Sequence, residues 1–274
     1  MSKTPRIETL FRLPLAECAE VTARAAQFPK HTHDEYVLSA NLSGHERIWY
    51  GGRSADVQAG QVTLYNPLTV QASEFGEADT RFVSLHLDAG AVRVALAECG
   101  SRLETPAFAE GVLDRPGLFR AILALRTPGT PAETEEACQV LLDELSRLGA
   151  APSGRPEPEH AARLVAFMQD NLYEPIGLDD LSAWSGLSRF HLVRSFKAAM
   201  SLPPMQFLKQ LRLIEARRRL RRGDAVVRVA HELHFYDQGH LGNAFRRAIG
   251  LAPGRYAALA ASGATNSRYP ESIT

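Results

Sequence analysis

Two histidines and a carboxylate are closely spaced in the segment HTHDE, at His31, His33 and Glu35. Alternate residues of a β-strand point to the same face, so the imidazole rings of His31 and His33 are predicted to lie side by side. Imidazole and carboxylate groups bind first-row transition metals, but such a site needs a further histidine from a distant strand. His86 is the only other histidine of a predicted strand that meets this need. We therefore predict no bound metal and no other cofactor.

Hydrogen bonding to a small organic molecule is the second chemistry that this part of the chain suits. The neutral side chains of His31, His33, Tyr65 and Gln71 both donate and accept hydrogen bonds. We predict that these four residues face one cavity and bind a small organic effector. A further interpretation stays open, in which the two histidines lie partly exposed at the mouth of a barrel and bind nothing.

Residues in the last part of the chain suit the recognition of DNA bases. The guanidinium of Arg194 matches O6 and N7 of guanine, whereas the amide of Asn243 or Gln238 matches N6 and N7 of adenine. Apolar side chains such as Phe190 suit the thymine methyl group, and glycines let the backbone approach the DNA closely. The predicted base-recognition residues are Phe190, Val193, Arg194, Gln238, Gly239, Gly242 and Asn243.

Two copies of one sequence pattern position these residues. FKAAMSLPP, residues 196–204, and FRRAIGLAP, residues 245–253, are related by an offset of 49 residues. Each copy predicts a helix, a tight turn and a second helix capped by Ser188 or Asp237, which is the helix-turn-helix pattern. The apolar residues of each second helix share one face, and the base-recognition residues lie opposite. The predicted phosphate contacts are Ser188, Arg189, Lys197, Arg218, Asp237, Arg246 and Arg247.

A helix between the two copies, over residues 205–222, is predicted to hold them apart. Its length is roughly 27 Å at 1.5 Å per residue, and successive major-groove faces lie about 34 Å apart. A rigid helix of this length keeps both second helices on one side of the duplex. We therefore predict that the two units bind one stretch of double-stranded DNA.

The first part of the chain predicts strands followed by helices. Five short segments bounded by turn residues indicate a small β-barrel or sandwich, namely 35–42, 46–50, 53–58, 61–67 and 80–87. Amphipathic helices are predicted over 115–126 and 131–149. The apolar stripe of the second helix packs on its own barrel or pairs with another subunit, and we predict a homodimer through 131–149. The predicted fold class is α+β, with an N-terminal β-barrel and an all-α C-terminal part.

Composition divides the chain at GAAPSGRPEPEH, residues 149–160, which has no hydrophobic period and is predicted to be a linker. Residues 1–148 then form a first domain and residues 161–258 a second domain, followed by a tail over 259–274. The N-terminus lacks an apolar signal core, and no apolar run approaches the roughly 20 residues that cross a bilayer. We therefore expect no membrane association and a cytoplasmic protein.

The formal net charge of zero conceals an asymmetry between the two parts of the chain. Residues 1–154 hold 14 basic and 20 acidic side chains, whereas residues 160–257 hold 15 basic and 8 acidic side chains. A basic second domain within a neutral chain favours a polyanionic partner for that domain alone.

Residues 161–257 resemble the DNA-binding domain of the AraC-type family of bacterial transcription regulators. The resemblance rests on LDDLSAWSGLSRFHLVRSFK, LRLIEARRRL and RVAHELHFYDQGHLGNAFRRAIGLAPGRYA, in this order. It implies that both second helices enter adjacent major grooves, and it assigns base recognition to the seven residues given above. The sequence departs from the family pattern at Ser201 and His234, where the family usually has glycine, and at Gly242 and Asn243.

The segments FPKHTHDEYVLSANLSGHERIWYGG and VQAGQVTLYNPLTVQ resemble the cupin-like effector-binding domain of the same family. Gln71 stands where a metal-binding cupin is expected to have its further histidine. The resemblance implies a ligand-responsive, sequence-specific transcription regulator that is not an enzyme. Its expected partners are double-stranded promoter DNA, a small organic effector and, as a candidate, RNA polymerase. Two alternatives stay open: a cupin-type metalloenzyme fused to a DNA-binding module, and a constitutive regulator whose first domain only dimerises.

Overall fold

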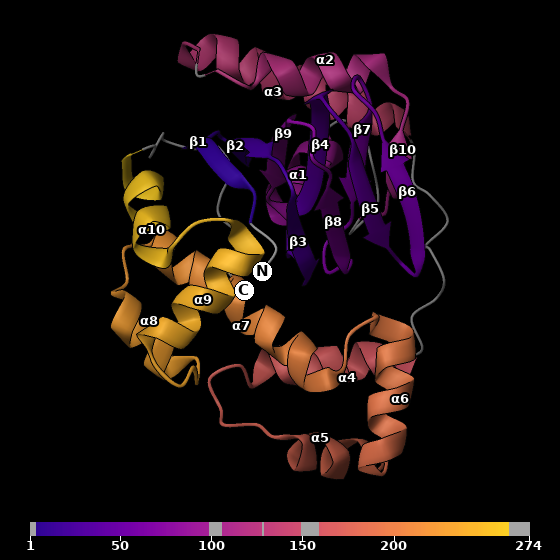
Figure 1. The fold of residues 1–274 in the computed structure, drawn as a ribbon, viewed down its shortest axis with the longest axis vertical. Helices are drawn as coiled ribbons and strands as arrows, with labels where there is room; N and C mark the ends of the chain where they lie inside the picture. Colours follow the sequence, from indigo (N-terminus) through magenta and orange to yellow (C-terminus); the bar gives the residue numbers. More distant parts are fainter. Residues whose placement is uncertain (1–3, 99–105, 128, 149–158, 263–274) are drawn as a thin grey trace.

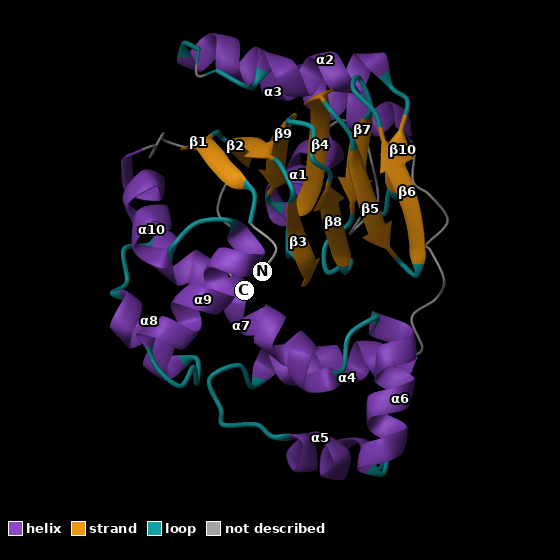
Figure 2. Ribbon diagram, in the orientation of Figure 1, coloured by secondary structure: helices purple, strands orange, loops and turns teal. Residues whose placement is uncertain are grey.

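A computed structural model of the chain describes residues 4–98, 106–127, 129–148 and 159–262. Its N-terminal part contains two antiparallel sheets and helices that cover one of them, and its C-terminal part is helical (Figure 1, Figure 2). The predicted α+β class is therefore confirmed. None of the described helices combines the length and the apolar composition that a membrane-spanning helix requires.

The two sheets face each other as a flattened barrel. The strands of the six-stranded sheet, in spatial order, are β1 (Arg6–Arg12), β2 (Ala16–Ala23), β9 (Thr80–Leu87), β4 (Tyr36–Ser43), β7 (Val62–Tyr65) and β10 (Gly111–Leu113). The strands of the four-stranded sheet are β3 (Ala26–His31), β8 (Gln71–Phe75), β5 (Glu46–Tyr50) and β6 (Arg53–Val57).

Strands β4, β5, β6, β7 and β9 match the five predicted segments, whereas β1, β2, β3, β8 and β10 match none of them. β3 has the sequence AQFPKH, and a proline such as Pro29 argues against a central strand. The structure places β3 at the edge of its sheet, where a missing backbone N–H is tolerated. β8 has the sequence QASEF, which carries no alternating apolar pattern to identify it.

Alternation along the central strands gives the two faces of the six-stranded sheet different roles. Leu38 and Leu85 point to one face and are fully buried in the core that the sheet shares with helices. Their neighbours Ser39 and Ser84 point to the opposite face, toward the four-stranded sheet. Because side chains alternate between faces, an apolar face is covered by helices and a more polar face lines the space between the sheets.

Helices α1 (Ala89–Glu98), α2 (Pro116–Ala124) and α3 (Pro131–Leu148) cover the apolar face, so the two amphipathic helices predicted after the strands are confirmed. The apolar stripe of α3 is buried in the same core as the strands. This stripe therefore packs on its own barrel, which was one of the two alternatives. Its members are Cys138, Leu141, Leu142 and Leu145.

The C-terminal part consists of two helix-turn-helix units joined by one long helix. The predicted caps are present, because the side chains of Ser188 and Asp237 accept hydrogen bonds from the backbone N–H groups of His191 and His240. The helices are α4 (Glu159–Asp170), α5 (Leu178–Ser185), α6 (Arg189–Met200), α7 (Pro204–Arg221), α8 (Val226–Glu232), α9 (Gln238–Ile249) and α10 (Pro253–Ser262).

Ser201 and His234, which stand where glycine was expected, both adopt positive φ, at 64° and 55°. Side chains other than glycine rarely occupy this region, so both turns are strained. The expected linker lies outside the described residues from 149 to 158, and the expected tail lies outside them from 263 to 274. Within the described residues, α4 begins at Glu159 and α10 ends at Ser262.

The barrel and the C-terminal helices share one hydrophobic core. Ile7 and Phe82 from the six-stranded sheet pack in the same cluster as Leu213 of α7 and Ala248 of α9. Helix α10 also contacts β1, and α9 contacts β3 (Figure 1). The two parts of the chain are therefore in direct contact on the side where the barrel is not covered by α1–α3.

Candidate effector cavity and DNA-binding face

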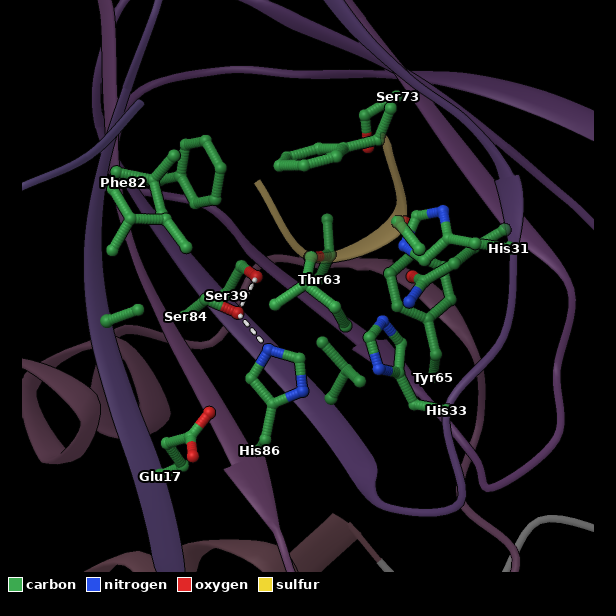
Figure 3. A pocket seen from close by; sticks show the side chains of 18 of the residues that line it. Glu17, His31, His33, Ser39, Thr63, Tyr65, Ser73, Phe82, Ser84 and His86 are labelled. Atoms are coloured by element: carbon green, nitrogen blue, oxygen red, sulfur yellow. Dashed lines mark hydrogen bonds between the residues drawn. The ribbon is translucent and has the colours of Figure 1, made fainter. Parts of the chain in front are cut away.

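A cavity of about 80 Å³ lies between the two sheets and is closed on one side by C-terminal helices. Polar side chains from both sheets point into it (Figure 3). The four residues predicted to bind an effector all line this cavity, so the structure brings the predicted set together. Each of the four is at most 6% exposed: His31, His33, Tyr65 and Gln71.

His31 and His33 are buried, so the interpretation that placed them partly exposed at the barrel mouth is wrong. Nδ1 of His31 donates a hydrogen bond to the carbonyl oxygen of Pro29 at 2.7 Å, which leaves Nε2 as an acceptor. Burial lowers the pKa of His31 to about 4 and the pKa of His33 well below its ordinary value. Both rings are therefore neutral at pH 7.

His33, Glu35 and His86 each bring one ligand atom to within 4.8 Å of the others. The Glu35 carboxylate, however, also accepts hydrogen bonds from Arg217 and, at 3.2 Å, from Arg221. Two guanidinium groups occupy acceptor positions that a metal would use, and their charge opposes a bound cation. The donor set fits an ion-pair network better than a metal centre, and the predicted absence of a metal stays a prediction.

Arg217 of α7 bridges two carboxylates of the barrel. Its Nη2 donates to Oε1 of Glu17 at 2.5 Å, its Nη1 donates to Glu35, and Tyr256 of α10 donates to Oε2 of Glu17 at 2.8 Å. Burial alone would raise the pKa of both carboxyl groups, but the charge of Arg217 lowers them below their ordinary values. We call Glu17, Glu35, Arg217 and Tyr256 the buried ion cluster.

The buried ion cluster was not predicted from the sequence. Arg217 stands in the arginine-rich run of residues 217–222, in which only Arg218 was given a role, as a predicted phosphate contact. A signal was nevertheless present, because Arg217 follows Leu213 by four residues and precedes Leu220 by three. These spacings place Arg217 on the apolar face of α7, and its side chain is 4% exposed.

The second functional face is formed by α6 and α9. Leu192 and Phe196 in α6, like Leu241 and Phe245 in α9, are completely buried, as the sequence predicted. Phe190 is 69% exposed, which is unusual for a large apolar side chain. The remaining predicted base-recognition residues are exposed or half-buried: Arg194, Gln238, Gly239 and Asn243 are exposed, and Val193 and Gly242 are half-buried.

Three of the predicted phosphate contacts are exposed cations on the same two helices. Lys197, Arg246 and Arg247 form no ion pair with the described residues, and neither does Arg194. Two further predicted contacts are the helix caps Ser188 and Asp237.

The other two predicted phosphate contacts are already paired with carboxylates. Arg189 forms an ion pair with Asp179. Arg218 donates to Oδ2 of Asp34 at 2.7 Å and pairs with Glu215 at 3.0 Å, so it faces the barrel. A phosphate contact by Arg218 would require the release of Asp34.

Comparison with known proteins gives two family-model matches. The model of the helix-turn-helix domain matches residues 181–258, and the model of the AraC-like ligand binding domain matches residues 13–150. The first match contains both of the proposed DNA-binding helices, and the second contains the strands that line the cavity except β1.

Relatives with this organisation are similar over most of the chain. The HTH-type transcriptional regulator YbfI of Bacillus subtilis (strain 168) is 26% identical over 226 residues, which cover 78% of this chain and 82% of YbfI. The HTH-type transcriptional regulator NimR of Escherichia coli (strain K12) is 27% identical over 216 residues, which cover 77% of this chain and 76% of NimR.

Among solved structures, wild-type ToxT from Vibrio cholerae strain SCE256 with a bound unsaturated fatty acid is similar with a TM-score of 0.58. The match covers 93% of this chain and 97% of ToxT at 11% sequence identity, so it concerns the fold alone. A ligand-binding barrel joined to tandem helix-turn-helix units, together with both family matches, shows that this chain belongs to the AraC family of helix-turn-helix transcriptional regulators.

Proposed function

We propose that this regulator binds promoter DNA by placing α6 and α9 in adjacent major grooves, with the seven predicted base-recognition residues directed at the bases. One observation carries the proposal. Four of the five Lys and Arg side chains of α6 and α9 have no ion-pair partner among the described residues, the exception being Arg189, whereas Arg217 and Arg218 of α7 are bound to carboxylates. Unpaired cations on an exposed helix face are the ones available to an anionic duplex.

The effector is proposed to act through the C-terminal helices that close one side of the cavity. Arg217 of α7 and Ala248 and Ile249 of α9 line the cavity together with the barrel strands. Helix α9 therefore contacts both the proposed ligand and the proposed DNA site. A molecule that binds with different affinity to two arrangements of α9 and the barrel shifts their populations and with them the affinity for DNA.

Genomic footprinting tests this function, because it identifies the bound sites and the neighbouring genes even when the operator sequence is unknown. Operator affinity is then measured with and without extracts of the metabolites of that pathway. A change in affinity supports the effector-responsive regulator. Equal affinity under both conditions would support a constitutive regulator whose first domain only dimerises.

We propose that the protein has no enzymatic activity. The alternative, a cupin-type metalloenzyme with a DNA-binding module, depends on the cluster of His33, Glu35 and His86. Elemental analysis of the purified protein distinguishes the two. Stoichiometric iron, zinc or manganese would favour the enzyme, and substoichiometric metal would favour the regulator.

We further propose a homodimer through residues 131–149, with RNA polymerase as an additional partner in the cytoplasm. The apolar stripe of α3 is buried within the chain, so the proposed contact uses its other face, on which Val140 is 47% exposed. Sedimentation of the wild type and of Val140→Glu tests the dimer. A monomer at all concentrations in the wild type would reject it.

A further inference from the structure

The cavity contains a carboxylate that has no cationic partner. Glu46, on β5, lines the cavity and is 6% exposed, yet no described basic side chain lies within ion-pair distance of it. Burial raises its pKa to about 7, although Ser73 acts in the opposite direction. Buried carboxylates are normally paired. Glu46 thus differs from Glu17 and Glu35, which share the charge of Arg217.

Ser73 and Tyr65 lie beside Glu46. His31 and Gln71 line the same cavity at the other end of the four-stranded sheet, because Gln71 pairs with His31 and Tyr50, whereas Glu46 pairs with Phe75. His31 presents Nε2 as an acceptor because its Nδ1 is bound to Pro29, and Gln71 offers an amide oxygen. The hydroxyl of Tyr65 is buried and makes no hydrogen bond of standard geometry with the described residues. Tyr65 also lies close enough to Glu46 for the carboxylate to raise the pKa of the phenol further above its buried value.

The described lining residues offer an anionic ligand no free arginine or lysine charge. Arg217 is the only arginine or lysine among the lining residues that the structure describes, and its charge is shared by Glu17 and Glu35. A carboxylate ligand would therefore enter next to buried carboxylates without a cation to receive it, which is costly in a site of low dielectric constant.

Apolar side chains also line the cavity, and the space is small. Ile7, Val21, Phe28, Phe82 and Ile249 line the cavity beside the polar groups. The volume is about 80 Å³, and one water needs about 10–15 Å³ by the same measure, so the cavity holds on the order of five to eight non-hydrogen atoms.

We propose that the cavity binds a small organic amine, whose ammonium group pairs with Glu46. The short hydrocarbon or aromatic body of the amine packs against the apolar lining. This inference relies on the proposed function only in calling the amine the effector of DNA binding, and the binding of the amine itself is tested separately.

The experiment measures binding to the full-length protein by isothermal titration calorimetry at pH 8. The probes are two sets of similar shape and different charge: butylamine, 1-butanol and butyrate, and benzylamine, benzyl alcohol and benzoate. We expect at least one amine to bind at least tenfold more tightly than the alcohol and the carboxylate of its set. Tighter binding of the carboxylate or the alcohol in both sets, or no binding of either amine, would overturn the proposal. This comparison needs no variant.

Glu46→Gln keeps the shape of the side chain and removes its charge, and Glu74→Gln, on the exposed face of the adjacent strand β8, is the matched control. We expect Glu46→Gln to weaken amine binding at least about tenfold, because a charge-assisted hydrogen bond is lost, and Glu74→Gln to leave it unchanged. Equal amine affinity in Glu46→Gln and the wild type would reject the role of Glu46. Salt-dependent binding of each protein to duplex DNA without amine is measured in parallel, so a failure of DNA binding and a failure of amine recognition are distinguishable.

Discussion

Replacement of Arg217 by methionine is the substitution whose effect on stability follows most directly from the structure. In Arg217→Met the carboxylates of Glu17 and Glu35 stay buried, at 6% and 8% side-chain exposure, without the cation that they share. Glu35 keeps Arg221 at 3.2 Å, whereas Glu17 keeps no cation within ion-pair distance among the described residues. Breaking a buried ion pair on one side costs about 3–5 kcal/mol, because an uncompensated charge remains. Because the partners of Arg217 lie in the barrel, this cost weakens the contact between the barrel and the C-terminal helices. The equilibrium constant for opening that contact therefore increases by roughly two to three and a half orders of magnitude.

Urea unfolding followed by circular dichroism measures the loss of stability, and small-angle X-ray scattering measures the separation of the two parts of the chain. Arg222→Met is the control, because Arg222 is exposed at the C-cap of the same helix and forms no ion pair with the described residues. We expect the first unfolding transition to have its midpoint at a lower urea concentration in Arg217→Met, and the radius of gyration to be larger. Neither change is expected in Arg222→Met.

A rescue experiment separates the ionic effect from lost packing. Replacing Arg217, Glu17 and Glu35 together by Met, Gln and Gln removes the unpaired charges, so most of the lost stability should return. If Arg217→Met costs less than about 1 kcal/mol, or if the triple variant is as unstable as the single one, the buried ion cluster does not hold the two parts together and the reasoning is refuted.

Three further predictions follow from individual residues. The pKa of Glu46 in the folded protein, about 7, lies above the ordinary value of 4.5, so the ionised carboxylate destabilises the ligand-free fold fully above pH 7 and not below pH 4.5. Glu46→Gln should therefore raise the free energy of unfolding by up to about 3 kcal/mol at pH 8 and by almost nothing at pH 4. Equal effects at both pH values would contradict this. Ser201→Gly should raise the free energy of unfolding by about 1 kcal/mol, because the residue has a φ of 64°; a decrease in the urea midpoint would show that the turn is not strained. Asp34→Asn should free Arg218 to contact a DNA phosphate, so the slope of log K for DNA binding against log salt concentration should steepen by about one unit. Arg218→Ala should leave this slope unchanged. An unchanged slope in Asp34→Asn would argue against a phosphate contact by Arg218.

Local rules were sufficient to predict the helical half of the fold. Ser188 and Asp237 cap helices because each is followed by a backbone N–H group that needs an acceptor, and this need depends only on neighbouring residues. The duplicated pattern added a second independent copy of the same evidence. In the barrel, β1, β2, β3, β8 and β10 were not among the predicted segments. For β8 and edge strand β3, the pairing partners and not their own sequences determine the conformation.

The candidate site was predictable in part. His31, His33, Tyr65 and Gln71 were found as polar residues in or beside predicted strands, and they line one cavity. Arg217 was not found, because its two partners lie 182 and 200 residues away in the sequence. Glu46 was not found either, since a single glutamate at the start of a strand gives no sign of burial. Both require the tertiary arrangement to be recognised.

The unpaired α6 and α9 cations make DNA recognition by two adjacent grooves the central claim, and base-resolved footprinting tests it directly. On an operator found by genomic footprinting, we predict that Arg194→Ala and Asn243→Ala each lose about 1–3 kcal/mol of discrimination at a single base pair. The two affected base pairs should lie about one helical turn apart, roughly 10 base pairs. A uniform loss of affinity across all sequences, or an effect of both variants at the same base pair, would contradict the account.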